Sequence, residues 1–336
     1  MSKNKEESLH ELMAGMKPRG KEPRNAGVLD SWIDHAEADF GIAASGRVRW
    51  LIASTVITAM LQQVVDDDNA CRFSLKGGTL LQHVFGLASR ATKDIDGIVR
   101  GDLDEFLELM DEQFVSRNWG PFEFARSEIE QIRVPGKSIC PRRFVVTVSL
   151  RNKTWRKIKV EVSPDEGMAG SAQEPFAAPS LEGFGIPTPE KLVGMAMCYQ
   201  AAQKIHAATD PHDPDKGYRN NRPRDLVDLV LIKQLSDSTG HPSKSDIKRA
   251  VIDIFEARAK EAVKADREPR VWPTKVVVYP HWANDYLAAA QAVDLRMSAE
   301  EAAEVVNAWL LELALDRCNA SNSSLTSGVN TWLRIF

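Results

Sequence analysis

Apolar and polar positions follow two different periods along this chain. Helical spacing of apolar side chains marks residues 48–64 and 103–114. Strand-like patterns mark four further segments, at residues 71–76, 94–99, 143–150 and 156–163. Arg151-Asn152-Lys153 separates the last two of these, so we expect a β-hairpin there. Beyond Pro189 the periods are helical almost throughout, and the whole pattern predicts the α+β class.

The distribution of residue types divides the chain into three parts. Residues 1–28 are polar and contain Pro18, Gly20 and Pro23, which predicts a flexible arm. We place a core with a mixed sheet at residues 29–186, ending in a segment rich in Pro, Gly, Ser and Ala that has room for one short strand. Residues 187–336 are expected to form a helical C-terminal domain, in which residues 319–327 link to an amphipathic tail at 329–336.

Composition and charge narrow the class of protein. A chain of 336 residues is long enough for two domains with sizeable cores. The net charge of −4 gives no overall indication of nucleic-acid binding. The N-terminal residues lack the apolar core expected of a signal peptide, and no apolar run approaches the ~20 residues that a membrane span needs. The four scattered cysteines predict reduced thiols, a cytoplasmic location and no structural zinc site.

The segment Lys76-Gly77-Gly78-Thr79 lies between a predicted strand and an apolar helix. Glycine lets a ligand approach the backbone N–H groups closely, and Thr79 can cap the helix. The positive end of the helix dipole favours an anion at the same place. We therefore expect these four residues to bind the phosphates of a nucleotide.

Asp94 and Asp96 are two residues apart on a predicted strand, so their side chains share one face. Two such carboxylates repel each other unless a cation or hydrogen-bond donors lie between them. Hard oxygen ligands at this spacing suit Mg²⁺ or Mn²⁺. A solvated Asp-x-Asp on an edge strand is the alternative, but the preceding glycine pair and the strand context favour the metal site.

Glu161 is the candidate for a third carboxylate. It shares one face of the second hairpin strand with Lys159. If this strand lies beside the strand of Asp94 and Asp96, the three acids can hold two metal ions. The spacing alone leaves it equally open that Lys159 and Glu161 are partners on a solvent-facing strand.

Lys204 and Asp225 form a second candidate cluster, on two successive predicted helices. Asp225 and Asp228 are three residues apart and therefore fall on one helical face. Lys204 would neutralise the β- and γ-phosphates as a point charge, and Asp225 would orient Lys204, a base or a ribose hydroxyl. An ordinary ion pair between two helices is the alternative. The choice between Asp225 and Asp228 as the functional acid stays open.

Basic residues gather in the sequence around these segments. They are Arg90, Lys93, Arg126, Arg133, Lys137, Arg142, Arg143, Arg151, Lys153, Arg156 and Lys157. Such a cluster would bind an RNA backbone locally despite the acidic total charge. Ordinary solvated charge is equally consistent with the pattern.

Four motifs, in the same order, resemble those of the AbiEii/AbiGii nucleotidyltransferase-like toxins. They are Leu75-Lys76-Gly77-Gly78-Thr79-Leu80 with Arg90-x-Thr92-x-Asp94-Ile95-Asp96, then Lys159-Val160-Glu161-Val162-Ser163, then residues 199–207, and then residues 221–229. Leu80 and Gly97 depart from the residues that are common in the family without removing a catalytic group. Gln203 stands where Glu is frequent. The similarity spans roughly residues 45–310.

This resemblance implies a polymerase-β-like nucleotidyltransferase core with a mixed sheet and a helical C-terminal domain. It implies the toxin of a toxin–antitoxin or abortive-infection system, which acts in phage defence and is neutralised by a cognate antitoxin. The implied reaction transfers NMP from an NTP to an acceptor and releases pyrophosphate. Because some members modify tRNA, the tRNA 3′ end is the expected acceptor.

The catalytic residues expected on this basis are Asp94, Asp96, Glu161, Lys204 and Asp225. The first three are the expected ligands of Mg²⁺ or Mn²⁺, and Lys204 would stabilise the leaving pyrophosphate. Two other functions stay open. One is a nucleotide-binding or partner-binding protein without transfer activity, and the other is a nucleotidyltransferase that acts on a protein or a small molecule.

Overall fold

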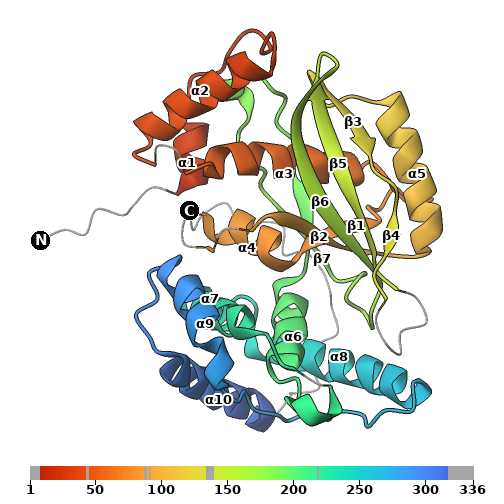
Figure 1. Ribbon diagram of the computed structural model, residues 1–336, viewed down its shortest axis with the longest axis vertical. Coiled ribbons are helices and arrows are strands. Elements are labelled where there is room, and N and C mark those ends of the chain that lie inside the picture. The colour runs from red at the N-terminus through yellow and green to blue at the C-terminus, as the bar shows by residue number, and fades with distance from the viewer. Residues whose placement is uncertain are drawn as a thin grey trace, which may run out of the picture.

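The computed structural model describes residues 8–42, 45–86, 89–90, 92–133, 140–217 and 219–316. The predicted linker and tail at 319–336 lie outside these residues. A part built around a β-sheet and a part built only of helices lie one above the other in Figure 1. The α+β class, with a mixed sheet and a helical C-terminal region, is confirmed.

A mixed sheet of eight strands forms the centre of the first part, as far as the chain is described. The strands are β1 (Phe73–Lys76), β2 (Asp94–Val99), β3 (Phe122–Arg126), β4 (Glu130–Gln131), β5 (Arg142–Leu150), β6 (Lys153–Pro164), β7 (Gln173–Phe176) and β8 (Leu192–Met195). Their order is β3-β5-β6-β2-β1-β8-β7, and β4 pairs with β5. β2 runs parallel to β6 and β1 parallel to β8, whereas the other neighbours are antiparallel.

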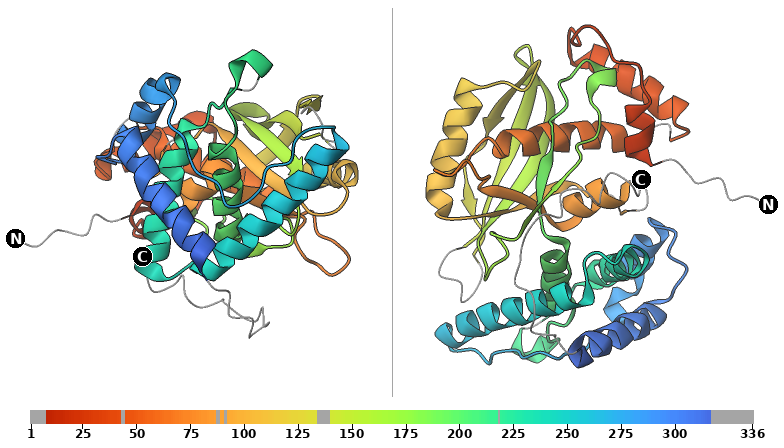
Figure 2. Two further views of the ribbon diagram at one scale, coloured as in Figure 1. Left: turned by 90° about the horizontal axis from the view of Figure 1, so that it is seen from below. Right: turned by 180° about the vertical axis from the view of Figure 1, so that it is seen from behind.

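Helices α1 (Leu9–Ala14), α2 (Ala26–Asp39), α3 (Arg47–Leu61), α4 (Gly77–Phe85) and α5 (Leu103–Ser116) accompany the sheet. Seen from behind, α3 runs across the sheet (Figure 2). The apolar sides of α3 and α5 share a core with Ile95 of β2 and with Val160 and Val162 of β6. Because side chains alternate along a strand, the residues between these positions face the opposite side of the sheet.

The second part consists of α6 (Met197–Ala208), α7 (Pro223–Thr239), α8 (Lys244–Lys264), α9 (Ala283–Gln291) and α10 (Ala299–Leu315), with short 3₁₀ turns between them. These helices bury their own core around Trp282 and Trp309. Ile98 of β2 belongs to this second core. The face of β2 that carries Ile98 therefore looks toward the helical part.

Two predicted boundaries need correction. The arm predicted at 1–28 contains α1, which has a Ser8–Glu11 capping box and buries Leu9 and Met13 in the core of the sheet. The boundary predicted at 186/187 precedes β8, yet β8 belongs to the sheet. This strand is a short apolar run directly before α6, and periodicity does not separate such a run from the start of a helix.

Gly97, one of the two departures from the motif that the sequence resembles, has a local explanation. The ring of Phe73 lies over it, and a Cβ atom on Gly97 would be 2.0 Å from Phe73 Cε2. No side chain fits at this position while Phe73 keeps its place in the core.

None of the helices in the described ranges combines the length and the apolar character that crossing a lipid bilayer requires.

Candidate active site

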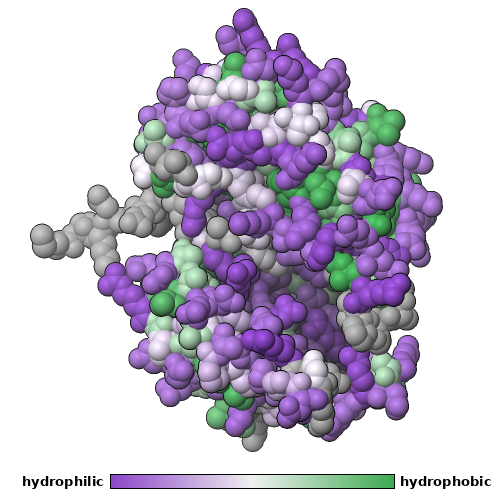
Figure 3. Space-filling view, in the orientation of Figure 1, coloured by the Kyte–Doolittle hydropathy of each residue, from purple (hydrophilic) through white to green (hydrophobic). Residues whose placement is uncertain are grey.

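Asp94, Asp96 and Glu161 lie on two neighbouring parallel strands. The register of β2 and β6 pairs Asp96 with Glu161 and Asp94 with Lys159. Since Ile95 is buried in the core of the sheet, all three acids lie on the other face, toward the helical part. The surface is hollowed between the two parts of the molecule, and hydrophilic residues line this hollow (Figure 3). The strand pairing on which the prediction of a third acid depended is present.

Basic side chains form ion pairs with two of these acids. Arg143, opposite Glu161 on β5, donates to Glu161 Oε1 from Nε at 2.9 Å, and its Nη2 lies 2.8 Å from the same oxygen. Lys159 Nζ lies 3.1 Å from Asp94 Oδ1 and 3.9 Å from Glu161 Oε1. Lys159 is thus closer to Asp94 than to its expected partner on the same strand.

The carboxyl group of Asp96 has a raised pKa. Burial, as the largest cause, together with the neighbouring charges of Glu161 and Asp94, raises the pKa of Asp96 to about 6 against the opposing effects of Lys76 and Lys204. A carboxylate with this pKa is partly protonated near neutral pH. A cation bound beside it would favour the ionised form.

The donor chemistry of this trio fits a hard divalent cation, because all the available ligands are carboxylate oxygens on one face of two paired strands. Within the described ranges, no three His, Cys, Asp or Glu side chains converge as a ready metal site. Arg143 and Lys159 hold the carboxylates of Glu161 and Asp94 in ion pairs. A metal ion would have to compete with these two ion pairs.

The turn from β1 into α4 lies directly against Asp96. Gly77 has a φ of +66°, and a Cβ atom there would be 2.5 Å from Asp96 Oδ2. Both the left-handed backbone and the close approach require glycine. Gln200 of α6 holds the turn in place, because it accepts from the Gly77 N–H and donates to the Gly77 carbonyl, each at 3.1 Å.

The other residues of this turn have structural contacts of their own. The Thr79 hydroxyl donates to the Asp94 carbonyl at 2.6 Å, and its side chain is fully buried. Lys76 Nζ donates to Ser163 Oγ of β6 at 3.0 Å, so this side chain reaches across β2. Thr79 therefore fixes the strand that carries the acids. The predicted phosphate contacts of Lys76, Gly77, Gly78 and Thr79 stay predictions.

Lys204 lies in a buried network of four charges. Its Nζ donates to Asp225 Oδ1 at 2.7 Å and to Asp228 Oδ2 at 2.6 Å. Arg90, from the segment before β2, donates to both oxygens of Asp228 at 3.1 Å. The two positive and two negative charges balance, and they join the helical part to the sheet part. The predicted Lys204–Asp225 pair is present, but Asp228 is the acid that binds both cations.

Burial and pairing oppose each other in this network. Burial alone would lower the pKa of Lys204, but Asp225 and Asp228 outweigh it and raise the pKa. Burial alone would raise the pKa of Asp228, but Lys204 and Arg90 outweigh it and lower the pKa. Both groups are therefore charged at neutral pH.

Sequence reasoning did not find the contacts that three residues of this site make. Gln200 was noted only within a motif, Arg143 only within the basic cluster, and Arg90 within both. The expected hairpin would not have found Arg143 by counting, because an unbroken count from the Leu150–Lys153 pair places Arg142 opposite Glu161. A β-bulge between Val148 and Ser149 shifts the register by one residue and puts Arg143 there. The pairing of Arg90 with Asp228, which is 138 residues away, has no local signal.

Much of the predicted basic cluster is already paired within the protein. Arg126 binds Asp111, Arg142 lies 2.9 Å from Asp104, and Arg156 lies 2.8 Å from Asp30. Lys137 lies outside the described residues. Lys93, Arg133, Arg151, Lys153 and Lys157 are exposed. Arg151 is at the hairpin tip, about 30 Å from Glu161 at ~3.3 Å per strand residue.

Comparison with known proteins identifies a family that this chain matches. The family described as "Nucleotidyl transferase AbiEii toxin, Type IV TA system" matches residues 59–308. Among solved structures, MenT4, a nucleotidyltransferase toxin from Mycobacterium tuberculosis H37Rv, is similar with a TM-score of 0.41 and 19% sequence identity, over 80% of this chain and 94% of that chain. No curated protein sequence matches significantly.

Proposed function

Because the chain belongs to the AbiEii family of nucleotidyltransferase toxins of type IV toxin–antitoxin systems, we propose that it transfers NMP from an NTP to the 3′ end of a tRNA and releases pyrophosphate. The observation that carries the proposal is the parallel pairing of β2 with β6. This pairing puts Asp96 opposite Glu161, next to the glycine turn that opens α4. A nucleotidyltransferase needs such acids beside a phosphate site.

Asp94, Asp96 and Glu161 are the proposed holders of Mg²⁺ or Mn²⁺. The bound metal would neutralise triphosphate charge and lower the pKa of the attacking hydroxyl. Glu161 would accept the proton of that hydroxyl at Oε2, because Oε1 already accepts from Arg143. Arg143 thereby orients the base.

The chain's own donors would bind the phosphates. The N-terminus of α4 and the ammonium group of Lys76 lie on the same side of the sheet as the acids. Lys204 would stabilise the leaving pyrophosphate after exchanging one carboxylate for a phosphate oxygen. Asp225 is the acid from which Lys204 would separate, because the side chain of Asp225 is 13% exposed whereas that of Asp228 is 1% exposed.

The partners follow from the same proposal. The exposed Lys93 and Lys157 flank the acid-bearing segments and would contact the RNA backbone. We further propose that a cognate antitoxin neutralises the toxin, that the protein acts on tRNA in the cytoplasm, and that it serves in phage defence.

Incubation of the purified protein with Mg²⁺, each NTP radiolabelled at the α-phosphate, and total tRNA tests the transfer. We expect the label on tRNA, with release of one pyrophosphate for each labelled molecule. Periodate-treated tRNA, which lacks the 3′-terminal diol, is the matched control and should stay unlabelled. NTP binding without pyrophosphate release would contradict the transferase proposal. Label on protein instead of tRNA would contradict the proposed acceptor.

A further inference from the structure

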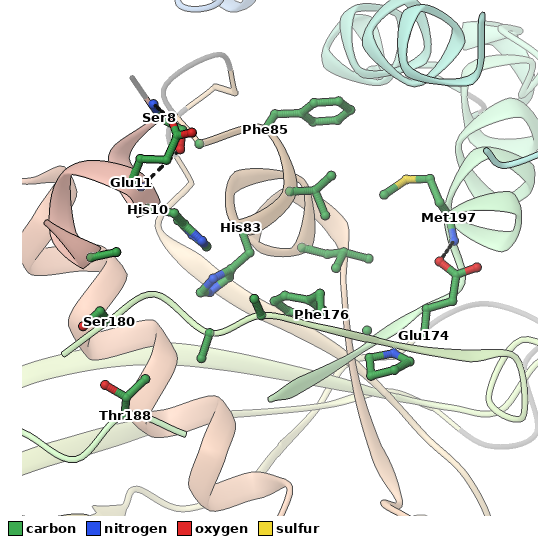
Figure 4. A pocket seen from close by; sticks show the side chains of 18 of the residues that line it. Ser8, His10, Glu11, His83, Phe85, Glu174, Phe176, Ser180, Thr188 and Met197 are labelled. Carbon is green, nitrogen blue, oxygen red and sulfur yellow. Dashed lines mark hydrogen bonds between the residues drawn. The ribbon is translucent and has the colours of Figure 1, made fainter. Parts of the chain in front are cut away.

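Two features of the surface have no part in the proposed reaction, and one of them points to a ligand. A mostly apolar pocket of about 400 Å³ lies beside α4, where Phe85, Phe176 and Met197 border it (Figure 4). The carboxylates at this pocket, Glu11 and Glu174, already accept backbone hydrogen bonds. The second feature, a cluster of aromatic rings in the helical part, combines open ring surface with exposed arginines and therefore defines the chemistry of its ligand.

The ring cluster consists of His212, Tyr279 and His281. His212 belongs to the loop between α6 and α7, which stands out from the body of the molecule in the left view of Figure 2, whereas the other two residues lie directly before α9. The ring centroid of His212 is 4.4 Å from that of Tyr279 and 4.7 Å from that of His281. The ring planes of Tyr279 and His281 are 18° apart. All three residues are partly exposed, so ring surface is open to solvent.

Buried Asn220 holds two of the three rings in place. Its side-chain amide donates to the carbonyl groups of Ala208 and Asp210, at 3.1 and 2.8 Å, which ties it to the end of α6. Its backbone N–H donates to Nδ1 of His212 at 3.2 Å, and its carbonyl group accepts from Nε2 of His281 at 2.7 Å. Ring faces that are held in this way lose little side-chain entropy when a ligand stacks on them.

The same two contacts determine which polar groups the histidines leave for a ligand. In the neutral ring of His212, Nδ1 accepts the hydrogen bond from Asn220, so Nε2 is a donor. In the neutral ring of His281, Nε2 donates to Asn220, so Nδ1 is an acceptor. A nucleobase has a flat face and an edge of donors and acceptors, and both have counterparts in this cluster.

Exposed arginines lie beside the ring cluster. Arg219 precedes Asn220, Arg222 follows it, and Arg224 is in the first turn of α7, and all three are exposed. The backbone N–H of Arg222 donates to the side chain of Asn220 at 3.1 Å, so the asparagine that holds the rings also places this arginine. The side chain of Arg222 is 57% exposed and lies 3.9 Å from Asp225. Such a loose, exposed pair exchanges readily for a phosphate.

The charge of this segment favours a polyanion. Residues 211–224 contain four basic and two acidic residues, whereas the whole chain has a net charge of −4. Positive charge that is concentrated on one loop of an acidic protein attracts an anionic partner to that place. Ring surface next to several basic side chains is the combination found in sites for unpaired nucleic acid.

The ring cluster is also close to the proposed nucleotide site. Ala208, whose carbonyl group accepts from Asn220, lies four residues beyond Lys204, or about 6 Å along the axis of α6. Lys204 shares Asp228 with Arg90, from the segment that leads into β2. An RNA strand that extends from the rings to the acids of β2 therefore spans only a few nucleotides.

We propose that the ring cluster binds unpaired bases next to the 3′ end of the acceptor RNA, and that Arg219, Arg222 and Arg224 bind the adjoining phosphates. The bases stack on His212 and Tyr279, because every base has a face that stacks on an aromatic ring. A paired base is already stacked on its neighbours, so the cluster selects RNA with an unpaired 3′ end over a blunt duplex. This inference rests on the proposed function for the identity of the acceptor.

RNA binding in the absence of NTP tests the inference separately from transfer. Fluorescence anisotropy measures the binding of two labelled RNA hairpins to the full-length protein, one with about four unpaired nucleotides at its 3′ end and one with a blunt end. We expect the hairpin with unpaired nucleotides to bind at least about fivefold more tightly, which is the effect of stacking one base. Equal affinity for the two hairpins, or binding of neither, would overturn the inference.

Variants locate the binding. Tyr279→Leu removes the ring but keeps an apolar side chain against Trp282, and it should bind the hairpin with unpaired nucleotides at least about fivefold more weakly. Tyr279→Phe keeps the ring and should bind as the wild type does. Arg222→Gln should lower the slope of log affinity against log salt concentration by about one. Arg151→Gln, at the exposed hairpin tip of the sheet part, is the control and should change neither affinity nor slope.

The outcomes separate this inference from the transfer reaction. Unchanged RNA affinity in Tyr279→Leu would overturn the stacking role, and an unchanged slope in Arg222→Gln would overturn the phosphate role. Weaker binding of NTP by Tyr279→Leu with unchanged RNA affinity would assign the rings to the nucleotide instead. Thermal unfolding shows whether each variant is folded, and Arg222→Gln alone decides the site if Tyr279→Leu is not. Weaker RNA binding by both variants of a protein that transfers no NMP would support the inference and contradict the proposed function.

Discussion

Two clusters of acidic and basic side chains lie where the sheet meets the helices, and they differ in how firmly their charges are held. On the acid face of β2 and β6, the side chains of Asp94 and Lys159 are each 38% exposed and that of Glu161 is 26% exposed. In the Arg90–Lys204–Asp225–Asp228 network, Asp228 is 1% exposed and Lys204 is 8% exposed. Half-exposed ion pairs are weak and exchange readily, whereas breaking a buried pair is strongly destabilising.

This difference separates ligand binding from structural support. The acids of the sheet face can leave Arg143 and Lys159 for a metal ion at small cost, as a binding site requires. The buried network is already complete, so Lys204 would reach a phosphate oxygen only by giving up Asp225, while Arg90 and Asp228 fix the helical part against the sheet. Four predictions test this division, in order of expected effect.

The largest effect is expected from Asp96→Ala. Removal of this acid should reduce the transfer rate by about 10²–10³-fold or more, because such groups contribute about 2.7–4 kcal/mol to lowering the barrier. Growth inhibition on expression should disappear, while the fold is retained. Pyrophosphate release by the purified variant measures the loss. Asp294→Ala, at a surface position 82% exposed, is the control and should keep the wild-type rate.

Asp228→Asn should affect stability more than any substitution on the sheet face. It leaves Arg90 and half of the Lys204 contacts without a negative partner, and breaking a buried ion pair in this way costs about 3–5 kcal/mol. Chemical denaturation measures the free energy of unfolding. The matched change on the sheet face, Asp94→Asn, should cost less than about 1 kcal/mol. Equal losses for the two variants would remove the distinction between the clusters.

The pH dependence of stability should reveal Asp96. Its folded-state pKa of about 6 lies above the ordinary value of 3.8, so the folded protein binds more protons than the unfolded chain between these values. The contribution of Asp96 to stability is therefore present at low pH and is lost as pH rises through about 6. Asp96→Asn lacks this loss and should exceed the wild type in stability by up to about 3 kcal/mol above pH 7. Parallel stability curves for the two proteins would contradict the raised pKa.

Arg143→Gln should give the smallest effect. It frees Glu161 from its ion pair, so the Mn²⁺ concentration needed for half-maximal transfer should fall about three- to tenfold, with a change in unfolding free energy below about 1 kcal/mol. Arg151→Gln at the exposed hairpin tip is the control. A higher Mn²⁺ requirement in Arg143→Gln would show that this arginine supports the metal site instead of competing with it.

The parts of the site that follow from local patterns were predictable from the sequence. Alternation along each strand predicts that Asp96 shares one face of its strand with Asp94, and that Glu161 shares one face of its strand with Lys159. The glycine turn was predictable because Gly77 and Gly78 lie between a predicted strand and a predicted helix. The sequence could not show which of Asp225 and Asp228 is the more deeply buried, because both lie on one helical face. Only the contact of Asp228 with Arg90 distinguishes them. Likewise, the third acid was predicted without its partner Arg143.

The fold, like the site, was predictable only where local patterns decide the structure. The hairpin at Arg151 and Asn152 was predictable, and both residues have the positive φ of a tight turn. Helix α1 was missed although its Ser8-x-x-Glu11 capping box is visible in the sequence, because its six residues are held by the burial of Leu9 and Met13 against distant elements. Tertiary packing, more than local propensity, decides such short elements.

The most direct test of the whole account is binding of Mn²⁺ in the presence of NTP, followed by electron paramagnetic resonance, in three variants beside the wild type. Asp96→Asn and Glu161→Gln should each weaken Mn²⁺ binding at least about tenfold, because each removes a charged ligand. Asp294→Asn, at a surface position that is 82% exposed, is the control and should bind Mn²⁺ as the wild type does. Unchanged Mn²⁺ affinity in both Asp96→Asn and Glu161→Gln would contradict the assignment of these carboxylates to the metal.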